Sequence, residues 1–411
     1  MGGGLPGLDR VGPASIAALG TIALGIADGG FFERSWAPAI VAFAAAVEVG
    51  LLVYSRVELS RLEVAVLLLL GAFVAWSALS AVWSDDPTAS LREAERSLLY
   101  LVALLAMLLA TRAGGASTLV IGVLVGATFV SLYGLIQYLA ARPPTDPVEG
   151  TLLFEPLGYA NAAGILAVIG IVISVGLVLD SSSFRERLVR ALPLVVLIPT
   201  LALTDSKGSW AALVVALVVL GAVRFRLSRA QVVLLVAALA VVGAAVVWAA
   251  GSGFWGERPS YWRVGWHEYR DNPALGSGAG TYVRFWGGTQ SPTGRIALDA
   301  HNLYLETLAE LGPVGLALLV AALALPLLAI RRGGAATVEG AAYVAYLVHA
   351  GIDWDWEMPA VTLAALGCAA ALLVSQREGQ SLVEFSPRWR AAAGFSTAVV
   401  AVALLAVAIF G

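Results

Sequence analysis

The sequence has little of what soluble enzymes place on their surfaces or use in thiol chemistry. Only 13% of its 411 residues are charged, and it holds three histidines, one cysteine, Cys368, and one lysine, Lys207. A single cysteine excludes an intramolecular disulfide, and its place in an apolar run argues against a thiolate nucleophile or thiolate metal site. The low content of charged residues excludes an ordinary soluble domain. The sequence also lacks a run of basic residues of the kind that binds nucleic acids.

What the chain has instead is hydrophobic residues, which make up 59% of it, in runs that repeat along its whole length. Runs of about 17–25 apolar residues have the length that spans a bilayer. We therefore predict an all-α polytopic membrane protein, a single transmembrane domain over residues 1–411, with 12 or 13 transmembrane helices. The predicted helices are 13–27, 36–54, 62–83, 96–112, 117–140, 160–179, 188–204, 207–224, 229–250, 301–330, 336–352, 358–375 and 390–410.

Three of these ranges carry specific expectations. We expect the first to be a retained helix rather than a cleaved signal, because no small-residue cleavage pattern precedes the next span. The range 96–112 is expected to be short and to lie partly in the membrane interface. Only TDSKGS separates 188–204 from 207–224, so these two form either a tight hairpin or one broken helix.

The placement of arginine predicts the orientation, since cytoplasmic connections of membrane proteins are enriched in positive charge. With a cytoplasmic N-terminus, alternate connections hold most arginines, whereas the opposite connections hold mostly acids. This assignment puts residues 251–300, a long polar loop, on the outer, extracytoplasmic side of the membrane. An odd number of helices also puts the C-terminus outside. The arginines of the inner connections include Arg56, Arg61, Arg112, Arg185, Arg187, Arg190, Arg224, Arg226, Arg229, Arg331, Arg332, Arg377, Arg388 and Arg390.

Four unusual polar segments meet the membrane on the same side in this topology. They are residues 150–164, 204–210, 251–300 and 349–359. We predict that they converge on one site. The loop 251–300 is expected to carry part of that site, because the most polar residues of the chain gather there.

Lys207 is unusual because it stands at a helix junction on the predicted outer face, against the trend of positive charge inside. An ammonium at membrane depth is costly and needs a partner or a function. One interpretation is a cation that pairs with Asp205 and extends to the interface. The other is a phosphate ligand, assisted by the Ser206 hydroxyl and by the backbone amides of the next helix.

Arginine and aromatic residues alternate where the polar loop begins. Arg258 and Arg263 flank a segment with Tyr261 and Trp262, and guanidinium groups bind phosphate oxygens in bidentate fashion. Aromatic side chains beside them suit a sugar ring, and equally suit the aromatic belt of a membrane interface.

His301 opens the helix that follows the loop. A histidine there can accept a proton, and the positive end of the helix dipole is expected to lower its pKa. The alternative is a structural histidine that caps the helix. His349, Asp353, Asp355 and Glu357 form a second polar group, a candidate metal or acid–base cluster, but their spacing matches no metal signature.

The order of three motifs indicates a family. The run RPSYWRVGW from Arg258, the turn DNPALGSGAGTY from Asp271 and the segment DAHNLYLETLAELGPVGL from Asp299 follow one another. This arrangement resembles the O-antigen ligase and O-antigen polymerase family of bacterial integral membrane glycosyltransferases. The motifs cover about 60 residues closely, and the helix count extends the similarity to most of the chain.

The resemblance implies a GT-C-like enzyme that transfers a glycan from undecaprenyl diphosphate to an acceptor hydroxyl on a glycan, lipid or protein. No metal, cofactor or nucleotide sugar is implied. Lys207 falls where the family usually has arginine, Arg258 matches the loop arginine, and His301 matches the motif histidine. These three are the predicted catalytic residues. The predicted substrate contacts are Arg263, Tyr261, Trp262, Asn302, Tyr159, Trp354 and Trp356, the last three as sugar-stacking rings.

Two other functions compete with transfer. A transporter or flippase for polyprenyl-linked glycans would also use an outward basic site, although one-sided polar groups argue against it. A peptidoglycan-type polymerase would depend on an outer acid, for which Asp299 and Glu155 are the candidates. The sequence does not separate ligase from polymerase and names no acceptor or sugar.

Overall fold

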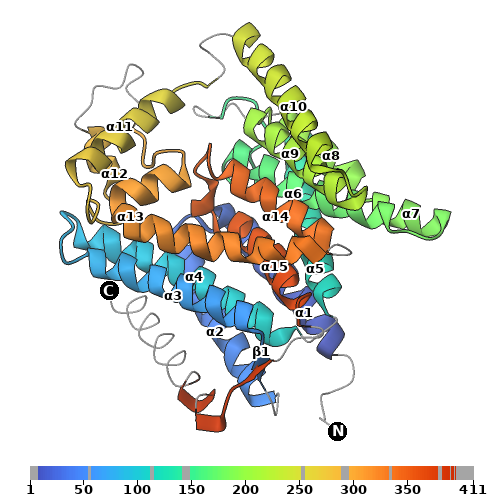
Figure 1. Cartoon of the computed structure of the whole chain (residues 1–411), viewed down its shortest axis with the longest axis horizontal. Helices are drawn as coiled ribbons and strands as arrows, with labels where there is room; N and C mark the ends of the chain where they lie inside the picture. Colours follow the sequence, from blue (N-terminus) through green and yellow to red (C-terminus); the bar gives the residue numbers. More distant parts are fainter. Residues whose placement is uncertain are drawn as a thin grey trace.

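The structure is a computed structural model of the whole chain, shown in Figure 1. It describes residues 8–53, 57–111, 115–140, 149–250, 255–287, 296–332, 336–377, 382–388, 390–392 and 394. The last predicted helix, 390–410, lies almost wholly outside the described residues. Helices dominate the described part, which contains a single two-stranded pairing of β1 with β2.

The first half of the chain forms helices close to the predicted ranges. They are α1 (Leu8–Gly25), the short 3-10 helix η1 (Asp28–Gly30), α2 (Glu33–Val53), α3 (Arg61–Ser80), α4 (Pro87–Ala110), α5 (Ala116–Ala140) and α6 (Ala160–Leu179), with β1 (Glu58–Leu59) before α3. Capping explains several boundaries. Ser60 and Glu63 form a reciprocal capping box at the start of α3, and Asp86 caps α4 ahead of Pro87.

The second half contains shorter helices around the polar segments. They are α7 (Phe184–Ala191), α8 (Leu194–Leu203), α9 (Lys207–Arg224), α10 (Arg229–Ala250), α11 (Arg258–Asp271), α12 (Tyr282–Gly287), α13 (Leu303–Ala324), η3 (Leu325–Arg332), α14 (Ala336–His349), η4 (Asp355–Glu357) and α15 (Pro359–Val374), followed by β2 (Val383–Glu384).

The predicted fold class, an all-α polytopic membrane protein, is confirmed. Within the described ranges, six helices are long and apolar enough to cross a membrane: Glu33–Val53, Arg61–Ser80, Ala116–Ala140, Ala160–Leu179, Lys207–Arg224 and Leu303–Ile330. Three shorter apolar helices accompany them. The innermost is α15, an alanine-rich helix that is buried along its whole length and packs against α1, α4, α5 and α14.

Two local expectations were wrong. The helix predicted at 96–112 is not short, because α4 begins at Pro87 and has 24 residues; the polar first half, with Arg92 and Arg96, hid its start. The range 188–204 is two helices, α7 and α8, which separate at Pro193 because proline breaks the helical hydrogen-bond pattern. The polar loop 251–300 contains two helices, α11 and α12.

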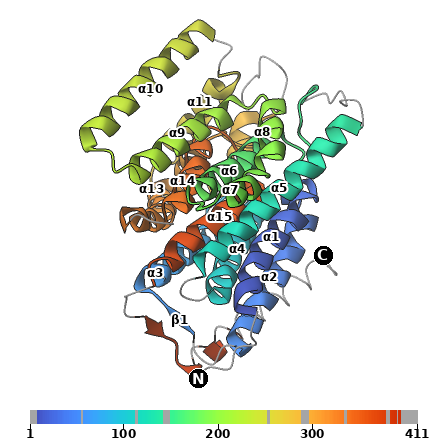
Figure 2. The ribbon, with the colours of Figure 1, turned by 90° about the vertical axis from the view of Figure 1, so that its right-hand side faces the viewer.

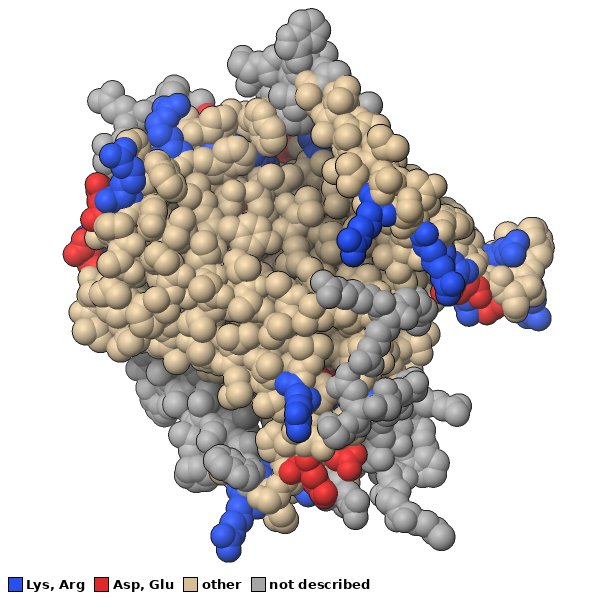
Figure 3. Space-filling model, in the orientation of Figure 1, with Lys and Arg blue, Asp and Glu red and all other residues tan. Residues whose placement is uncertain are grey.

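The connections predicted to be cytoplasmic gather at one end of the bundle. There β1 pairs with β2, and the buried Arg377 forms an ion pair with Glu63 and donates to the backbone oxygens of Thr111 and Leu108. At the opposite end lie α11, α12 and the beginning of α13 (Figures 1 and 2). The space-filling view in Figure 3 shows a broad uncharged surface between charged margins, as expected for a belt of lipid contact.

Candidate active site

Arg258 is the first residue of α11, where Pro259 at the first turn favours the start of a helix. Its Nε donates to the backbone oxygen of Ile352 at 2.7 Å, and one terminal nitrogen forms an ion pair with the buried carboxyl of Asp353. Within the described part of the chain, the other terminal nitrogen has no hydrogen-bond partner, and 24% of the side chain is exposed. The arginine is therefore fixed in place while part of its guanidinium group can meet a ligand.

Asp353 is the centre of this network, because groups from two other segments point at its carboxyl. The Tyr159 hydroxyl donates at 2.5 Å to Oδ1, and the Asn161 amide donates at 2.7 Å to Oδ2. Burial is the largest single cause and raises the pKa of Asp353. The positive charges of Arg258, His349 and His301 and the hydrogen bond from Tyr159 together lower it by more, so the net shift is downward. The carboxylate form is thus favoured, and it joins the start of α6 to the start of α11.

His301 lies in the turn just before α13 and has a left-handed backbone with φ of 51°. This conformation is uncommon in residues other than glycine, and contacts with neighbouring groups must stabilise it. Asp299 supplies part of that support: its Oδ1 accepts from the His301 backbone amide at 3.0 Å and lies 2.7 Å from the ring Nδ1. Glu306 adds more, since its Oε2 accepts from the Ala300 amide at 2.5 Å.

The pKa of His301 is raised, which corrects the expectation that the helix dipole would lower it. Burial is the largest single cause and lowers this pKa, but the charge of Asp299, its hydrogen bond and the charge of Asp353 together raise it by more. A carboxylate that contacts Nδ1 favours the tautomer with its proton on Nδ1, which leaves Nε2 as the basic nitrogen. The pair has the arrangement of a base and the group that orients it.

Aromatic rings surround the imidazole. The Tyr261 ring lies 4.5 Å from the His301 ring, between centroids, and the Trp354 ring lies 6.4 Å from it. Trp354 in turn packs on Tyr159 at 4.5 Å. The Trp262 indole donates to the His301 backbone oxygen at 3.5 Å. The structure therefore brings Tyr159, Tyr261, Trp262 and Trp354 together around His301 and Asp353.

Lys207 is the first residue of α9 and is exposed, next to a buried hydrogen-bond chain. Ser206 caps α9 through its hydroxyl, and Ser209 one turn later lies 3.1 Å from Nε2 of His349. His349 Nδ1 contacts Asp355 at 3.0 Å. A Cβ added at Gly208 would lie 3.1 Å from both His349 and Ile352, the residue whose oxygen holds Arg258. Lys207 and Arg258 therefore approach the same short segment, residues 349–353.

The remaining predicted residues lie elsewhere or have structural contacts. Arg263 is on the exposed face of α11. Asn302 caps α13, because its Oδ1 accepts from the Leu305 amide at 3.0 Å. Trp356 is only 8% exposed, and its backbone oxygen accepts from Tyr100 and Thr362 inside the bundle. The structure therefore does not bring Trp356 to the surface that the other rings share.

A glycine-rich turn, residues 272–280, holds the loop against α13. Gly276 has φ of 77°, and a Cβ there would lie 2.2 Å from the backbone of Glu310. The Glu310 carboxyl accepts from the amides of Gly280 and Tyr282 at 2.8 and 3.0 Å. Glu268 of α11 binds Ser277 and Thr281, and burial raises its pKa to about 7. These hydrogen bonds and the close backbone contact hold α11, and with it Arg258, in place against α13.

Sequence reasoning gave too little weight to three acids, Asp353, Glu306 and Glu310. The last two are four residues apart, so they share one face of α13, and this spacing on an otherwise apolar helix was a readable signal. Asp353 lies in a segment that the sequence indicated as part of the site, but no role in positioning Arg258 was predicted for it. Among the described residues, no group of three or more histidine, cysteine, aspartate or glutamate side chains has the geometry to hold a metal ion.

The fold and the site define a class: a multi-pass helical membrane protein in which a cation–carboxylate–imidazole centre forms at one end of the bundle. Residues 192–320 match the family model described as O-antigen ligase. The matched span is less than half of the chain, and it agrees with the resemblance that the sequence motifs indicate. The matched span holds Lys207, Arg258 and His301, whereas Tyr159 and Asp353 lie outside it. A search of curated proteins gives no match to the chain.

Proposed function

We propose that the protein transfers a glycan from a polyprenyl diphosphate, of the undecaprenyl type, to an acceptor hydroxyl at the outer face of the inner membrane. The observation that supports this most is the meeting of four distant segments. Arg258, His301 and Asp353 form one connected group, and Gly208, next to Lys207, packs against Ile352, whose backbone oxygen holds Arg258. Cations beside a base suit a reaction with a diphosphate leaving group.

The proposed step is a direct displacement at the anomeric carbon. Nε2 of His301 takes the proton of the acceptor hydroxyl as its oxygen forms a bond to that carbon. The bond between the anomeric carbon and the phosphate oxygen breaks, and its electron pair leaves with the diphosphate. Arg258 and Lys207 offset the charge that develops on the departing oxygens. Attack opposite the leaving group inverts the anomeric configuration, and no residue in this scheme requires a metal.

Each neighbouring residue has a place in this scheme. Asp353 holds Arg258, Asp299 orients His301, and the rings of Tyr159, Tyr261 and Trp354 lie where a sugar would pass between the two. Lysine at 207 keeps the charge of the usual arginine but binds phosphate as a point charge rather than through a two-pronged fork.

An assay with one purified lipid-linked repeat unit in proteoliposomes tests the proposal. A new glycosidic bond with an inverted anomeric centre supports transfer. A ladder of longer lipid-linked products indicates a polymerase, whereas a product formed only after a separate acceptor is added indicates a ligase. Movement of the labelled lipid across the bilayer without any new bond would instead favour the flippase alternative and contradict the proposal.

A further inference from the structure

A polar pocket of about 430 Å³ lies next to the segment that leads to His301. Its wall comes from the start of α2, the first half of α4, the glycine-rich turn and the start of α13. Leu298 and Glu306 belong to this wall, and Glu306 binds the amide of Ala300, the residue directly before His301. The volume is within the range of small-ligand sites, roughly 300 to 1,000 Å³.

Aromatic rings separate this pocket from the cationic centre. The Phe31 ring, which lines the pocket, lies 5.4 Å from the Trp354 ring, and Trp354 also faces His301. Phe32 packs edge-on against Phe31 at 5.3 Å and is 46% exposed, so its ring is available at the mouth. A ligand in the pocket would therefore have the rings of Phe31 and Phe32 on one side, and Trp354, which contacts Phe31, also faces His301.

Acidic side chains outnumber basic ones in the lining of the pocket. Six of its lining residues carry carboxyl groups and two carry guanidinium groups. Both arginines are already paired: Arg92 with Glu33 at 3.3 Å, and Arg96 with Glu93 and with Glu357, the latter at 3.0 Å. Carboxyl groups accept hydrogen bonds from hydroxyls, whereas they repel phosphate and other carboxylates.

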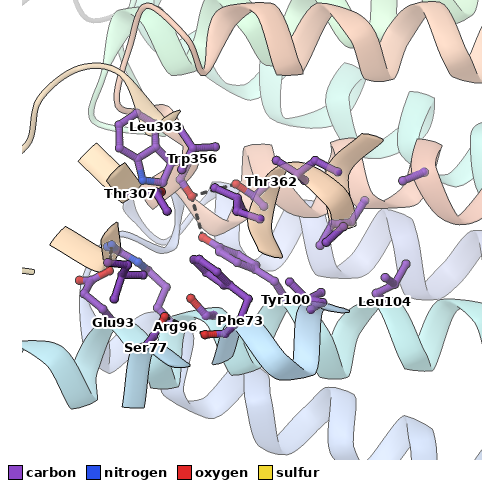
Figure 4. A pocket seen from close by; sticks show the side chains of 18 of the residues that line it. Phe73, Ser77, Glu93, Arg96, Tyr100, Leu104, Leu303, Thr307, Trp356 and Thr362 are labelled. Atoms are coloured by element: carbon purple, nitrogen blue, oxygen red, sulfur yellow. Dashed lines mark hydrogen bonds and ion pairs between the residues drawn. The ribbon is translucent and has the colours of Figure 1, made fainter. Parts of the chain in front are cut away.

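The paired Arg96 also marks how deep a polar ligand can enter. An adjoining cavity of about 110 Å³ shares Glu93 and Arg96 with the polar pocket. Beyond these two residues its lining is mostly apolar and includes Phe73 and Leu104. Figure 4 shows Glu93 and Arg96 at one end of this cavity and Leu104 toward the other. A hydroxyl-rich molecule would lose its hydrogen bonds past this point.

We propose that the polar pocket binds the acceptor and selects an uncharged oligosaccharide over a phosphorylated or uronate-bearing one. This inference rests on the proposed function and adds a location and a charge preference for the acceptor. His301 would then lie between two subsites of opposite character: cations for the diphosphate donor on one side, and carboxyl groups with aromatic rings for the acceptor hydroxyls on the other.

Photoaffinity labelling tests the location without any transfer reaction. The full-length protein is irradiated with a diazirine-bearing neutral oligosaccharide, and the labelled peptides are mapped. We expect adducts within residues 31–36, 86–96, 280–283 or 298, with competition by unlabelled neutral oligosaccharide and at least about tenfold weaker competition by a phosphorylated analogue. Adducts confined to other regions, or equal competition by both sugars, would overturn the proposal.

Kinetics with rim variants test the selectivity. Phe32→Ala and Glu33→Gln are each expected to raise the KM for a neutral acceptor roughly three- to tenfold, because each removes one contact, with the KM for the donor unchanged. Glu33→Gln should also weaken the discrimination against an anionic acceptor. The matched control is Asp271→Asn, an exposed acid at the end of α11 outside the pocket.

The two proposals fail in different ways. If the wild type forms no glycosidic bond from a lipid diphosphate donor, the proposed function fails, whatever the labelling shows. If the wild type transfers glycan but both rim variants keep the wild-type acceptor KM and selectivity, the acceptor pocket is wrong and the proposed function stands.

Discussion

At the residue scale, the site depends on carboxyl groups that hold its basic residues in place. Asp353 keeps Arg258, Tyr159 and Asn161 together, and Asp299 keeps His301 in an uncommon backbone conformation. Each acid acts by positioning a basic residue and does not have to contact the substrate. The variants Asp353→Asn and Asp299→Asn separate the positioning of Arg258 from the positioning of His301.

Asp353→Asn removes the negative charge and retains the size of the side chain. We expect kcat/KM for transfer to fall about 30-fold or more, because loss of one partner of a buried charge pair costs at least about 2 kcal/mol. Arg258 would keep its bond to the Ile352 oxygen but lose its fixed direction. Steady-state kinetics measure the effect, and Asp271→Asn controls for loss of an exposed acid. Unchanged kinetics in Asp353→Asn would show that Asp353 does not position Arg258.

Asp299→Asn changes the pH dependence. Asp299 raises the pKa of His301, so removing its charge should lower that pKa. Because the free imidazole is the active form, the acid limb of kcat/KM against pH should move to lower pH. The plateau rate should also fall, since a less basic imidazole is a weaker proton acceptor. A full pH–rate profile checks both effects, and an acid limb that stays in place would argue against His301 as the base.

At the element scale, α11 and α13 are locked by the glycine-rich turn rather than by a large apolar interface. Gly276 contacts the backbone of Glu310, and Gly312, with φ of 66°, contacts the backbone of Ala274. Both glycines have left-handed backbones and no room for a side chain. The turn therefore sets the distance between Arg258 at the start of α11 and His301 at the start of α13.

Gly276→Ala should disrupt this lock. A Cβ would lie 2.2 Å from backbone atoms that cannot rotate away, and the left-handed backbone adds strain, for a total of at least about 1–3 kcal/mol. We expect a lower Tm and a loss of transfer. Gly287→Ala is the control, since no atom lies within 4 Å of its added Cβ. Equal Tm values for the two variants would contradict the role of the turn.

The sequence predicted most elements because bilayer-length apolar runs with capped ends leave few alternatives. The bounds of α6, α9 and α10 agree with prediction to the residue. The prediction of helices from the sequence missed the charged first half of α4. It also missed α11, a short polar helix that follows an apolar run. The site was predicted in part: motif order indicated Arg258 and His301, but only the fold shows that Asp353, about 50 residues beyond His301 in the sequence, holds Arg258.

At the scale of the whole molecule, the two ends of the bundle differ in chemistry. The predicted inner end holds the β1–β2 pair and the arginines of α7, and the other end holds α11, α12 and the site. The orientation in the membrane stays a prediction from the placement of arginine. It follows that reagents outside the cell should reach only one end.

Cysteine labelling tests the orientation directly. Cys368 is fully buried, so Cys368→Ala supplies a cysteine-free background. Asp271→Cys in that background should react with a membrane-impermeant maleimide in intact spheroplasts. Arg187→Cys, on the exposed α7, should react only after the membrane is permeabilised. The reverse pattern would place the site in the cytoplasm and exclude transfer at the outer face.

The central claim is that Arg258 and His301 act together on a lipid diphosphate donor and an acceptor alcohol. The most direct test is the rate of glycan transfer from a purified donor by the wild type, Arg258→Ala and His301→Ala in proteoliposomes, with Tm as the check on folding. We predict that each variant unfolds near the wild-type Tm and transfers glycan at least about 100-fold more slowly. Wild-type rates in both folded variants would contradict the account.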